Sequence, residues 1–361
     1  MPRTRRARSR KPATSYDVAK AAGVSRSAVS RTFTAGASVS PDTRARVLEV
    51  ARALNYRPNL FARSLKTRQS FIVGLAVSNL DNQHYPKLVQ RFSEEFARIG
   101  YRLLLFVTHG STGADPVLDE LLKFHVDALI LASSSVSSVL AEACRAAGVP
   151  VVMFNNVDVN SDVTSVSTHN ELGGRTIAGY LLAAGHRRFG YIAGFDEDSS
   201  SHERQRGFTR HLVASGARKP VRAPGFFSFD GATQATRTLL RLPEPPDAIF
   251  CNNDHMALAA IEVARYEFGR EPGRDISIVG FDDVEVASWR AYRLTTYAQP
   301  IEAMVTKTID LIGMAIRSEL PAQLHEQLPG RLIVRDSARR PANGLVETIH
   351  GDLTWTPPKS R

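Results

Sequence analysis

The sequence predicts an α/β protein in two parts: a small helical N-terminal module and a two-lobed body of parallel sheets flanked by helices. Residues 70–335 alternate short apolar runs, each long enough for one strand, with longer amphipathic stretches of helical period. Such alternation is typical of parallel sheets covered by helices. The strand-like runs form two similar series, too many for one simple sheet, so we expect two lobes. The charge of the chain also changes abruptly near residue 68.

The basic charge is concentrated at the N-terminus. Residues 1–68 hold 16 of the 46 Lys and Arg residues but three of the 36 acids, which gives +13, whereas the rest of the chain sums to −3. A basic surface of this kind binds a polyanion, either nucleic acid or an anionic membrane. The alternative is a solvated charge run with no partner.

The composition excludes several other classes of protein. With 43% hydrophobic and 23% charged residues, the chain is neither wholly disordered nor collagen-like nor a coiled coil. No apolar run is long enough to cross a bilayer, and none follows the basic start as it would in a secretory signal, so we expect a cytoplasmic protein. Two cysteines, Cys144 and Cys251, are too few for a disulfide scaffold and are expected to be buried, small hydrophobic residues.

The first elements are a basic arm and two short helices. Residues 1–12 have no apolar periodicity and are expected to be a disordered arm that contacts phosphates. Within the predicted module of residues 13–57, Thr14 and Asp17 form the pattern of a capping box, and Gly23 can end the helix that they begin. Ser25 can cap a second helix over residues 26–33. Two short helices joined by a turn with glycine predict a helix-turn-helix.

The second helix has a buried face, with Val29 and Phe33, and an exposed face that is polar and basic. In a helix-turn-helix the start of this helix enters the major groove, where an Arg can grip a guanine through two hydrogen bonds. The alternative is a face that touches only phosphates. The candidate base-reading residues on the exposed face are Arg26, Ser27, Ser30 and Arg31.

A third helix and a short linker follow. Ser40, Pro41 and Asp42 suit the first turn of a helix, and Pro58 ends it because proline disfavours helix at the residue before it. Residues 58–69 include one further short segment, too short to be helical alone in water. Basic residues flank this segment and would draw it to DNA.

Three stretches, DVAKAAGVSRSAVSR, VSPDTRARVLEVARALNYRPN and ARSLKT, together resemble the DNA-binding region and hinge of the lactose/galactose repressor (LacI/GalR) family of bacterial transcriptional regulators. The resemblance implies a homodimer on a pseudo-palindromic operator, with a hinge helix in the minor groove and Leu65 wedged between base pairs. The family's Asn-Gly turn after the second helix is replaced by Thr34-Ala35-Gly36. The resemblance assigns these residues to DNA: Thr14, Tyr16, Ser25, Arg26, Ser27, Ala28, Ser30, Arg31, Asn59, Ala62 and Leu65.

In the body, the apolar runs predict nine strands, and the amphipathic stretches between them predict helices. Strands are expected at residues 71–77, 102–107, 128–132, 149–154, 163–167, 189–193, 248–251, 276–280 and 295–298. Helices are expected at residues 87–99, 172–184, 204–215, 256–268 and 301–317. Because ligands of such folds bind outside the carboxyl ends of the strands, the polar residues directly after strands are the candidates for binding. They are Ser78-Asn79, Asn155-Asn156, Asp254 and Asp282-Asp283.

No catalytic pattern is present in the sequence. It contains no phosphate-binding loop, no GxGxxG after the first strand and no His or Cys residues at metal-ligand spacing. The pair Asp282-Asp283 has no nucleophile or metal partner at a recognisable spacing. We therefore expect neither an enzyme nor a bound metal or cofactor.

The resemblance continues through GHRRFGYIAG, ERQRGF, PDAIFCNNDHMALAA, DISIVGFDD and LTTYAQP, which occur in the family's order. It implies a periplasmic-binding-protein-like body whose lobes clamp a small effector, commonly a sugar or nucleobase. It places Arg204 and Asp282 at the ligand, where donors and acceptors can hold a vicinal diol. The remaining effector residues that it implies are the polar Ser78, Asn155, Ser200 and Asn253 and the aromatic Tyr85 and Phe229. Hydrogen bonds that close the lobes are the alternative role for the polar ones.

Two departures from the family pattern lie near the expected cleft. The family's Asp-Asn pair is His169-Asn170 in this sequence, and its Asn-Pro-Phe-Phe loop is Asn82-Gln83-His84-Tyr85. The effector therefore need not be a common one.

The sequence ends in residues 336–361, a polar stretch that is expected to be a disordered tail. The whole pattern predicts a cytoplasmic DNA-binding transcriptional regulator, a repressor, whose operator affinity is controlled by a carbohydrate-like effector. One rival is the solute-binding protein of an importer, which the missing signal and the +13 module oppose. The other is an enzyme on a two-lobed scaffold, which the absence of a catalytic pattern opposes.

Overall fold

The computed structural model describes residues 13–34, 36–57, 69–77, 80–107, 123–132, 143–157, 163–320 and 324–357. The chain divides into two compact units, Met1–Ser70 and Phe71–Arg361, close to the position where the charge changes. The predicted basic arm and the hinge, with Asn59, Ala62 and Leu65, lie outside the described residues, as does Ser78 in the body.

The first unit is a three-helix cluster whose predicted caps are confirmed. Its helices are α1 (Ser15–Ala22), α2 (Arg26–Thr32) and α3 (Pro41–Ala53). The hydroxyls of Thr14, Ser25 and Ser40 each accept a hydrogen bond from a backbone N–H in the first turn that follows them. The small core contains Val18, Ala19, Ala22, Val29, Val47 and Ala51. Phe33, expected inside the second helix, is its C-cap and packs edge-on against Tyr56.

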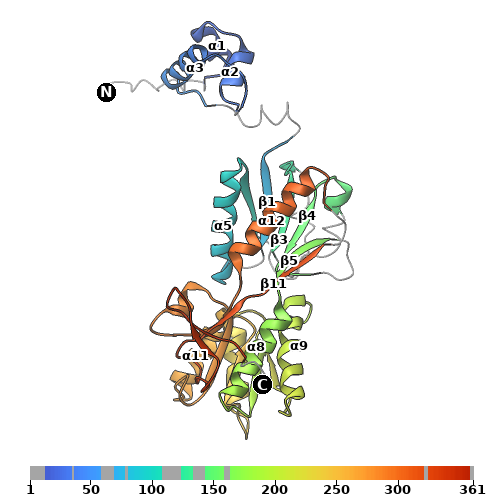
Figure 1. Ribbon diagram of the computed structural model, residues 1–361, viewed down its shortest axis with the longest axis vertical. Helices are drawn as coiled ribbons and strands as arrows, with labels where there is room; N and C mark the ends of the chain where they lie inside the picture. Colours follow the sequence, from blue (N-terminus) through green and yellow to red (C-terminus); the bar gives the residue numbers. More distant parts are fainter. Residues whose placement is uncertain are drawn as a thin grey trace, which may run out of the picture. The chain divides into compact units, whose positions relative to one another are not determined.

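The N-terminal lobe of the second unit contains a parallel sheet of six strands in the order β11-β5-β4-β3-β1-β2. Its strands are β1 (Ile72–Val77), β2 (Arg102–Val107), β3 (Ala128–Ala132), β4 (Val151–Phe154), β5 (Thr164–Thr168) and β11 (His325–Leu328). One face is covered by two helices that lie side by side, α5 (His84–Arg98) and α12 (Ile301–Ile316) (Figure 1). Leu88, Phe92 and Phe96 of α5 pack with Met304 and Val305 of α12 in the core beneath them.

The C-terminal lobe contains eight strands in the order β13-β14-β12-β10-β9-β8-β6-β7. The five strands from β10 to β7 are parallel, and β12, β14 and β13 add an antiparallel edge. Their bounds are β6 (Phe189–Ala193), β7 (Val221–Pro224), β8 (Ala248–Cys251), β9 (Ser277–Asp282), β10 (Thr295–Ala298), β12 (Arg331–Ile333), β13 (Leu345–Glu347) and β14 (Leu353–Trp355).

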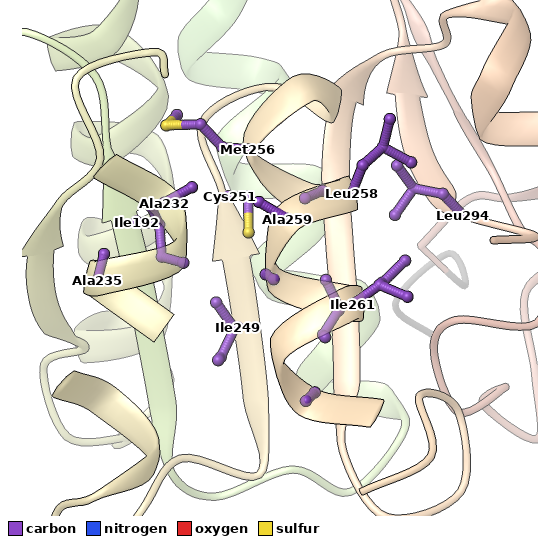
Figure 2. Close-up of a cluster of buried hydrophobic side chains, with 14 of the residues drawn as sticks. Ile192, Ala232, Ala235, Ile249, Cys251, Met256, Leu258, Ala259, Ile261 and Leu294 are labelled. Carbon is purple, nitrogen blue, oxygen red and sulfur yellow. The ribbon is translucent and has the colours of Figure 1, made fainter. Parts of the chain in front are cut away.

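Helices cover both faces of this eight-stranded sheet. On one face lie α8 (Asn170–Ala183) and α9 (Ser199–Ala214), and on the other lie α10 (Phe229–Leu240) and α11 (Asp254–Glu262). A π-helical turn η2 (Val263–Glu267) follows α11, and a 3-10 turn η3 (Glu285–Ser288) follows β9. Because side chains alternate along a strand, Ile249 and Cys251 enter the core under α10 and α11, shown in Figure 2, whereas Phe250 enters the core under α8 and α9. Both cysteines are buried and unpaired, as predicted.

The chain passes between the two sheets three times. It crosses from β5 to α8, from β10 to α12 and from β11 to β12. Each crossing follows the carboxyl end of a strand, so the crossings surround the edge at which a ligand is expected in such a fold.

The expectation of a disordered tail over residues 336–361 is wrong for the residues that the structure describes. Strands β13 and β14 form a hairpin that pairs with β12 and extends the sheet. Trp355 is only 3% exposed, packs edge-on against Tyr180 and donates its indole N–H to the carbonyl of Asn343 at 3.0 Å. The apolar side chains of this hairpin are few and lie on short strands, so the polar composition concealed it.

Other elements also escaped the sequence analysis. Strands β7, β11 and β12 and helix α10 were not predicted. Strands β7 and β11 have few buried side chains, so they lack the continuous apolar run that marks a buried parallel strand.

Candidate nucleic-acid interface and ligand cleft

The start of α2 presents the predicted polar and basic side chains to solvent. Arg26 occupies the first helical position after the cap Ser25, and Ser27, Ser30 and Arg31 are exposed on the same helix. The hydroxyls of Ser25 and Ser27 are 2.8 Å apart, which fixes the approach to the helix. Of the other predicted residues, Thr14 caps α1, Tyr16 is exposed in its first turn and Ala28 is half-buried.

The turn after α2 is held by a residue that the sequence analysis did not single out. Arg44 of α3 donates one guanidinium N–H to the carbonyl of Thr32 at 2.8 Å and another to that of Ala37 at 3.2 Å. Gly36 has φ 73°, so a residue suited to the left-handed region is present even though the family's Asn-Gly is not. Arg44 therefore ties the end of α2 to α3.

In the second unit, Arg204 and Asp282 meet at the carboxyl edge of the eight-stranded sheet. Arg204 Nη1 lies 3.9 Å from Asp282 Oδ1, and both side chains are almost fully buried. Arg204 donates to the side-chain oxygen of Asn170 at 2.9 Å and to the backbone carbonyl of Asn252 at 2.7 Å. Its guanidinium also stacks on the ring of Phe281, 3.7 Å from the centroid. These contacts leave Nη2 without a hydrogen bond to any described residue.

Two glycines bring Arg204 to this position. A side chain at Gly174 of α8 would collide with the backbone carbonyl of Arg204, and one at Gly207 of α9 would collide with that of Glu171. The helices α8 and α9 therefore approach each other backbone to backbone. The close approach carries the Arg204 side chain over the end of β9.

A chain of hydrogen bonds runs from Asp282 to the other lobe. Gln299 donates to Asp282 Oδ1 at 2.6 Å, and Thr168 at the end of β5 donates to Gln299 Oε1 at 2.6 Å. A cavity of about 460 Å³ opens beside this chain. It is lined by His84, Lys87, Asp282, Asp283 and Val284 and by residues 298–303 and 329–331, which belong to two of the three crossing segments. It has the size of a small-molecule site.

Two ionisable side chains near this cavity have shifted pKa values. Complete burial, aided by the charge of Asp282, raises the pKa of Asp254 to about 8. Burial lowers the pKa of His84, and Asp282 opposes that change. His84 is the first residue of α5 and belongs to the stretch Asn82-Gln83-His84-Tyr85, in which the sequence analysis noted a departure from the family pattern.

Of the remaining predicted effector residues, two polar side chains make hydrogen bonds at helix N-termini and two aromatic side chains lie at the start of helices. The side-chain oxygen of Asn253 caps α11 by accepting from the N–H of Met256 at 3.0 Å, and Ser200 donates to Asp198, the N-cap of α9. Tyr85 is half-buried in the first turn of α5, and Phe229 begins α10 with 40% of its surface exposed.

Buried amide groups without a partner mark the same edges of the sheets. Asn155 follows β4, and its Oδ1 has no hydrogen-bond partner among the described residues. Asn252 follows β8 with no exposed surface, and neither atom of its side-chain amide bonds to another residue in the part of the chain that the structure describes. Both residues therefore place amide groups at the strand ends where such folds bind ligands.

The backbone is also strained at these strand ends. Asn155 has φ 57°, Asp282 has φ 127° and Asp283 has φ 58°, a region that side-chain-bearing residues rarely adopt. Strain of this kind collects where a protein holds a ligand.

Comparison with known proteins agrees with this arrangement. The profile "Bacterial regulatory proteins, lacI family" matches residues 14–59, and "Periplasmic binding protein-like domain" matches residues 178–338. The ribose operon repressor of Escherichia coli (strain K12) is 32% identical over 330 residues, which cover 90% of this chain and 100% of the relative. Catabolite control protein A of Priestia megaterium is 30% identical over 334 residues, 90% of this chain and 99% of the relative.

The chain belongs to the lacI family of bacterial regulatory proteins. This regulator also shares the fold of a lac repressor dimer solved with operator and the anti-inducer ONPF, at a TM-score of 0.81 and 28% identity over 91% of this chain and 100% of that one. A complex of the transcriptional regulator CelR with cellobiose gives a TM-score of 0.67 at 30% identity, over 90% and 100%. The predicted fold class, family and role as a DNA-binding transcriptional regulator are thereby confirmed.

Within the described part of the regulator, no group of three or more His, Cys, Asp or Glu side chains is placed to hold a metal ion. None of its described helices is long and apolar enough to span a membrane.

The sequence analysis missed three residues of the cleft: Asn170, Asn252 and Gln299. Gln299 directly follows β10, and Asn252 directly follows β8, so the rule that ligands bind at strand ends would have found both. Asn170 was noted only as part of a departure from the family. Its bond to Arg204 depends on the packing of α8 on α9, which no local pattern shows.

Proposed function

We propose that this regulator is a repressor that binds a pseudo-palindromic operator as a homodimer and changes its operator affinity when a small carbohydrate binds in the cleft. The observation that carries the proposal is the presence, in one lacI-family chain, of a basic helix-turn-helix and a cleft with Arg204 facing Asp282. The related ribose operon repressor and the solved complex of CelR with cellobiose support a sugar as the effector.

At the DNA, Arg26 and Arg31 are the base-reading candidates. Both are exposed on α2, and Arg26 lies in its first turn, the part of a recognition helix that reaches base edges. Asn59, Ala62 and Leu65 are proposed to act in the hinge on the same operator.

At the effector, the cleft offers donors and acceptors suited to hydroxyl groups. Arg204 Nη2, Asn155 Oδ1 and both atoms of the Asn252 side-chain amide have no hydrogen-bond partner among the described residues. Paired donors and acceptors of this kind hold the vicinal hydroxyls of a sugar. We further propose that the regulator acts in the cytoplasm and catalyses no reaction.

Titration of labelled DNA from upstream of its own gene tests the DNA-binding function. The full chain should bind with an affinity that falls steeply with salt, by about 0.9 in log K per unit log salt for each phosphate neutralised. Deletion of residues 1–68 should abolish binding while residues 70–361 stay folded. Binding by residues 70–361 alone, or a flat salt profile, would contradict the proposal.

A matched pair of variants tests the reading of bases. Arg26→Ala should relax base preference at one symmetric pair of operator positions, by about 1–3 kcal/mol for a lost bidentate contact. Arg52→Ala removes the same charge from α3, and we expect it to weaken binding to all sequences equally. If both variants lose affinity without a change in base preference, Arg26 contacts only phosphate.

A further inference from the structure

A group of aromatic side chains is exposed at the carboxyl edge of the eight-stranded sheet. Phe195 follows β6 and is 42% exposed, and Phe226 follows β7 and is 51% exposed, with their ring centroids 6.0 Å apart. The ring centroid of Phe227 lies 5.8 Å from that of Phe195, and Phe227 packs against the hydrophobic core. Exposed rings gathered in one place indicate a binding surface more often than isolated ones do.

The backbone is strained to present these rings. Phe226 and Phe227 have φ 53° and 52°, two consecutive bulky residues in a region that normally suits glycine. Phe227 can turn inward only because Gly194 has no side chain, since a Cβ there would collide with the Phe227 ring. The turn thereby half-buries the Phe227 ring and leaves the Phe226 ring exposed. Such strain is characteristic of functional sites.

The aromatic group lies on the same rim as the pair of Arg204 and Asp282. The strands run in the order β9-β8-β6-β7, so Asp282, Asn252, Phe195 and Phe226 follow the carboxyl ends of four adjacent strands. Neighbouring strands are about 4.8 Å apart, which places Phe195 and Phe226 roughly 10 to 15 Å from Asp282 along the rim. One sugar ring cannot span that distance.

A further aromatic contact lies at the start of α10, the helix that follows β7. Phe229 packs edge-on against His255, with ring centroids 6.0 Å apart. Asp282 and Asp81 both act to raise the pKa of His255, which burial lowers. His255 is therefore close to the polar pocket and also to Asp81, which belongs to the other lobe.

We propose that Phe195, Phe226 and Phe229 form a second subsite of the cleft, and that it binds the second ring of an oligosaccharide whose first ring lies at Arg204 and Asp282. A sugar ring has an apolar face of C–H groups that packs on an aromatic ring, and its hydroxyls remain free for the polar groups between the subsites. The effector is thus a carbohydrate of two or three units. The inference rests on the proposed function and adds the effector's size to it.

Sugar binding to the full-length regulator tests the second subsite. Calorimetry and operator titration would use mono-, di- and trisaccharides built from glucose, galactose, xylose, mannose and arabinose, each monosaccharide being compared with its own oligomers. At least one oligomer should bind about tenfold or more tighter than its monosaccharide, because an additional ring face is buried. The double variant Phe195→Ala/Phe226→Ala should remove that advantage and leave the affinity for the monosaccharide unchanged.

Tyr266→Ala is the matched control, because Tyr266 is 74% exposed in the same lobe but lies on η2, beyond the end of α11 that is far from the cleft. It should leave the oligomer's advantage intact. The subsite is disproved if a monosaccharide binds as tightly as its oligomers, if the advantage survives in the double variant, or if no oligomer of the panel binds. Operator binding without sugar is measured in the same titrations. If one of these three outcomes is found and operator binding persists, only the second subsite is disproved and the DNA-binding function stands. If operator binding is absent, the proposed function itself is disproved.

Discussion

At the scale of single residues, Arg204 has two tasks, since it faces the cleft and also joins α9 to α8 and β8. Replacement by Met keeps much of the packing on Phe281 but leaves Asp282 as a buried charge and removes donors from Asn170 and Asn252. We expect the free energy of unfolding of the body to fall by about 3–5 kcal/mol, as is usual when one partner of a buried ion pair is lost. Urea unfolding of residues 70–361 measures this change.

Arg218→Met provides the control for that experiment. Arg218 pairs with Glu244 at 3.7 Å on the open surface, where such a pair contributes about 1 kcal/mol or less. If both variants lose the same stability, the buried network around Arg204 does not contribute as its geometry indicates.

Asp254 predicts a dependence of stability on pH. Its carboxyl accepts from Thr296 and from the N–H of Val284, but burial, with Asp282 and Asp283 nearby, raises its pKa to about 8. A carboxyl with a raised pKa in the folded state keeps its proton there and loses it in the unfolded chain. This group therefore costs stability progressively as pH rises from about 4 to about 8.

The variant Asp254→Asn should lack that loss. Urea unfolding at pH 5, 6, 7 and 8 should show the stability of the variant gaining on the wild type as pH rises, because Asn does not titrate. The lowered pKa values of His84 and His186 change stability in the opposite direction in both proteins and cancel in the comparison. A constant difference between the two proteins across this range would show that Asp254 is ionised when folded.

At this scale, the sequence identified the residues of the effector site but not the contacts that each of them makes. Arg204 and Asp282 were predicted to be together, and the structure brings them to 3.9 Å. The sequence did not show that the side chains of Ser200 and Asn253 take part in helix capping, because Ser and Asn suit a cap and a ligand site equally well. Their roles at the effector stay predictions.

At the scale of elements, the terminal hairpin of β13 and β14 should contribute to the stability of the body. Trp355 fills a space between Tyr180 and Gly179, so Trp355→Ala leaves a cavity. We expect the free energy of unfolding to fall by about 3–5 kcal/mol, the usual cost of removing a large buried aromatic side chain. Ile349→Ala in the turn of the same hairpin is the control, because Ile349 is 96% exposed and its loss should change little. Equal stability of all three proteins would mean that the hairpin is detached in solution.

The same elements show where a sequence can be interpreted and where it cannot. The buried parallel strands β3 and β6 were predicted at their observed bounds, because each is a continuous apolar run. Strand β13 has one half-buried and two exposed residues, so its place in the sheet comes from pairing with β14 rather than from its own composition. Pairing between distant segments is a property of the fold that local periodicity does not contain.

At the scale of the whole molecule, the two lobes are joined at the cleft by side chains as well as by the three crossing segments. Gln299 accepts from Thr168 of the six-stranded sheet and donates to Asp282 of the eight-stranded one. A ligand that displaces or strengthens the bond between Gln299 and Asp282 therefore acts on the contact between the lobes.

This arrangement predicts that effector and operator are coupled through Gln299. Coupling between two sites is reciprocal, so the factor by which saturating effector changes operator affinity must equal the factor by which operator changes effector affinity. We expect that factor to lie between about 5 and 150, the usual range for allosteric proteins. Gln299→Leu keeps the volume of the side chain but breaks the link from Thr168 to Asp282, so both factors should move together toward one. Operator titrations with and without effector, and effector titrations with and without operator, give the two values. If Gln299→Leu weakens effector binding while both factors keep their wild-type value, Gln299 is a contact to the ligand and the lobes communicate by another route.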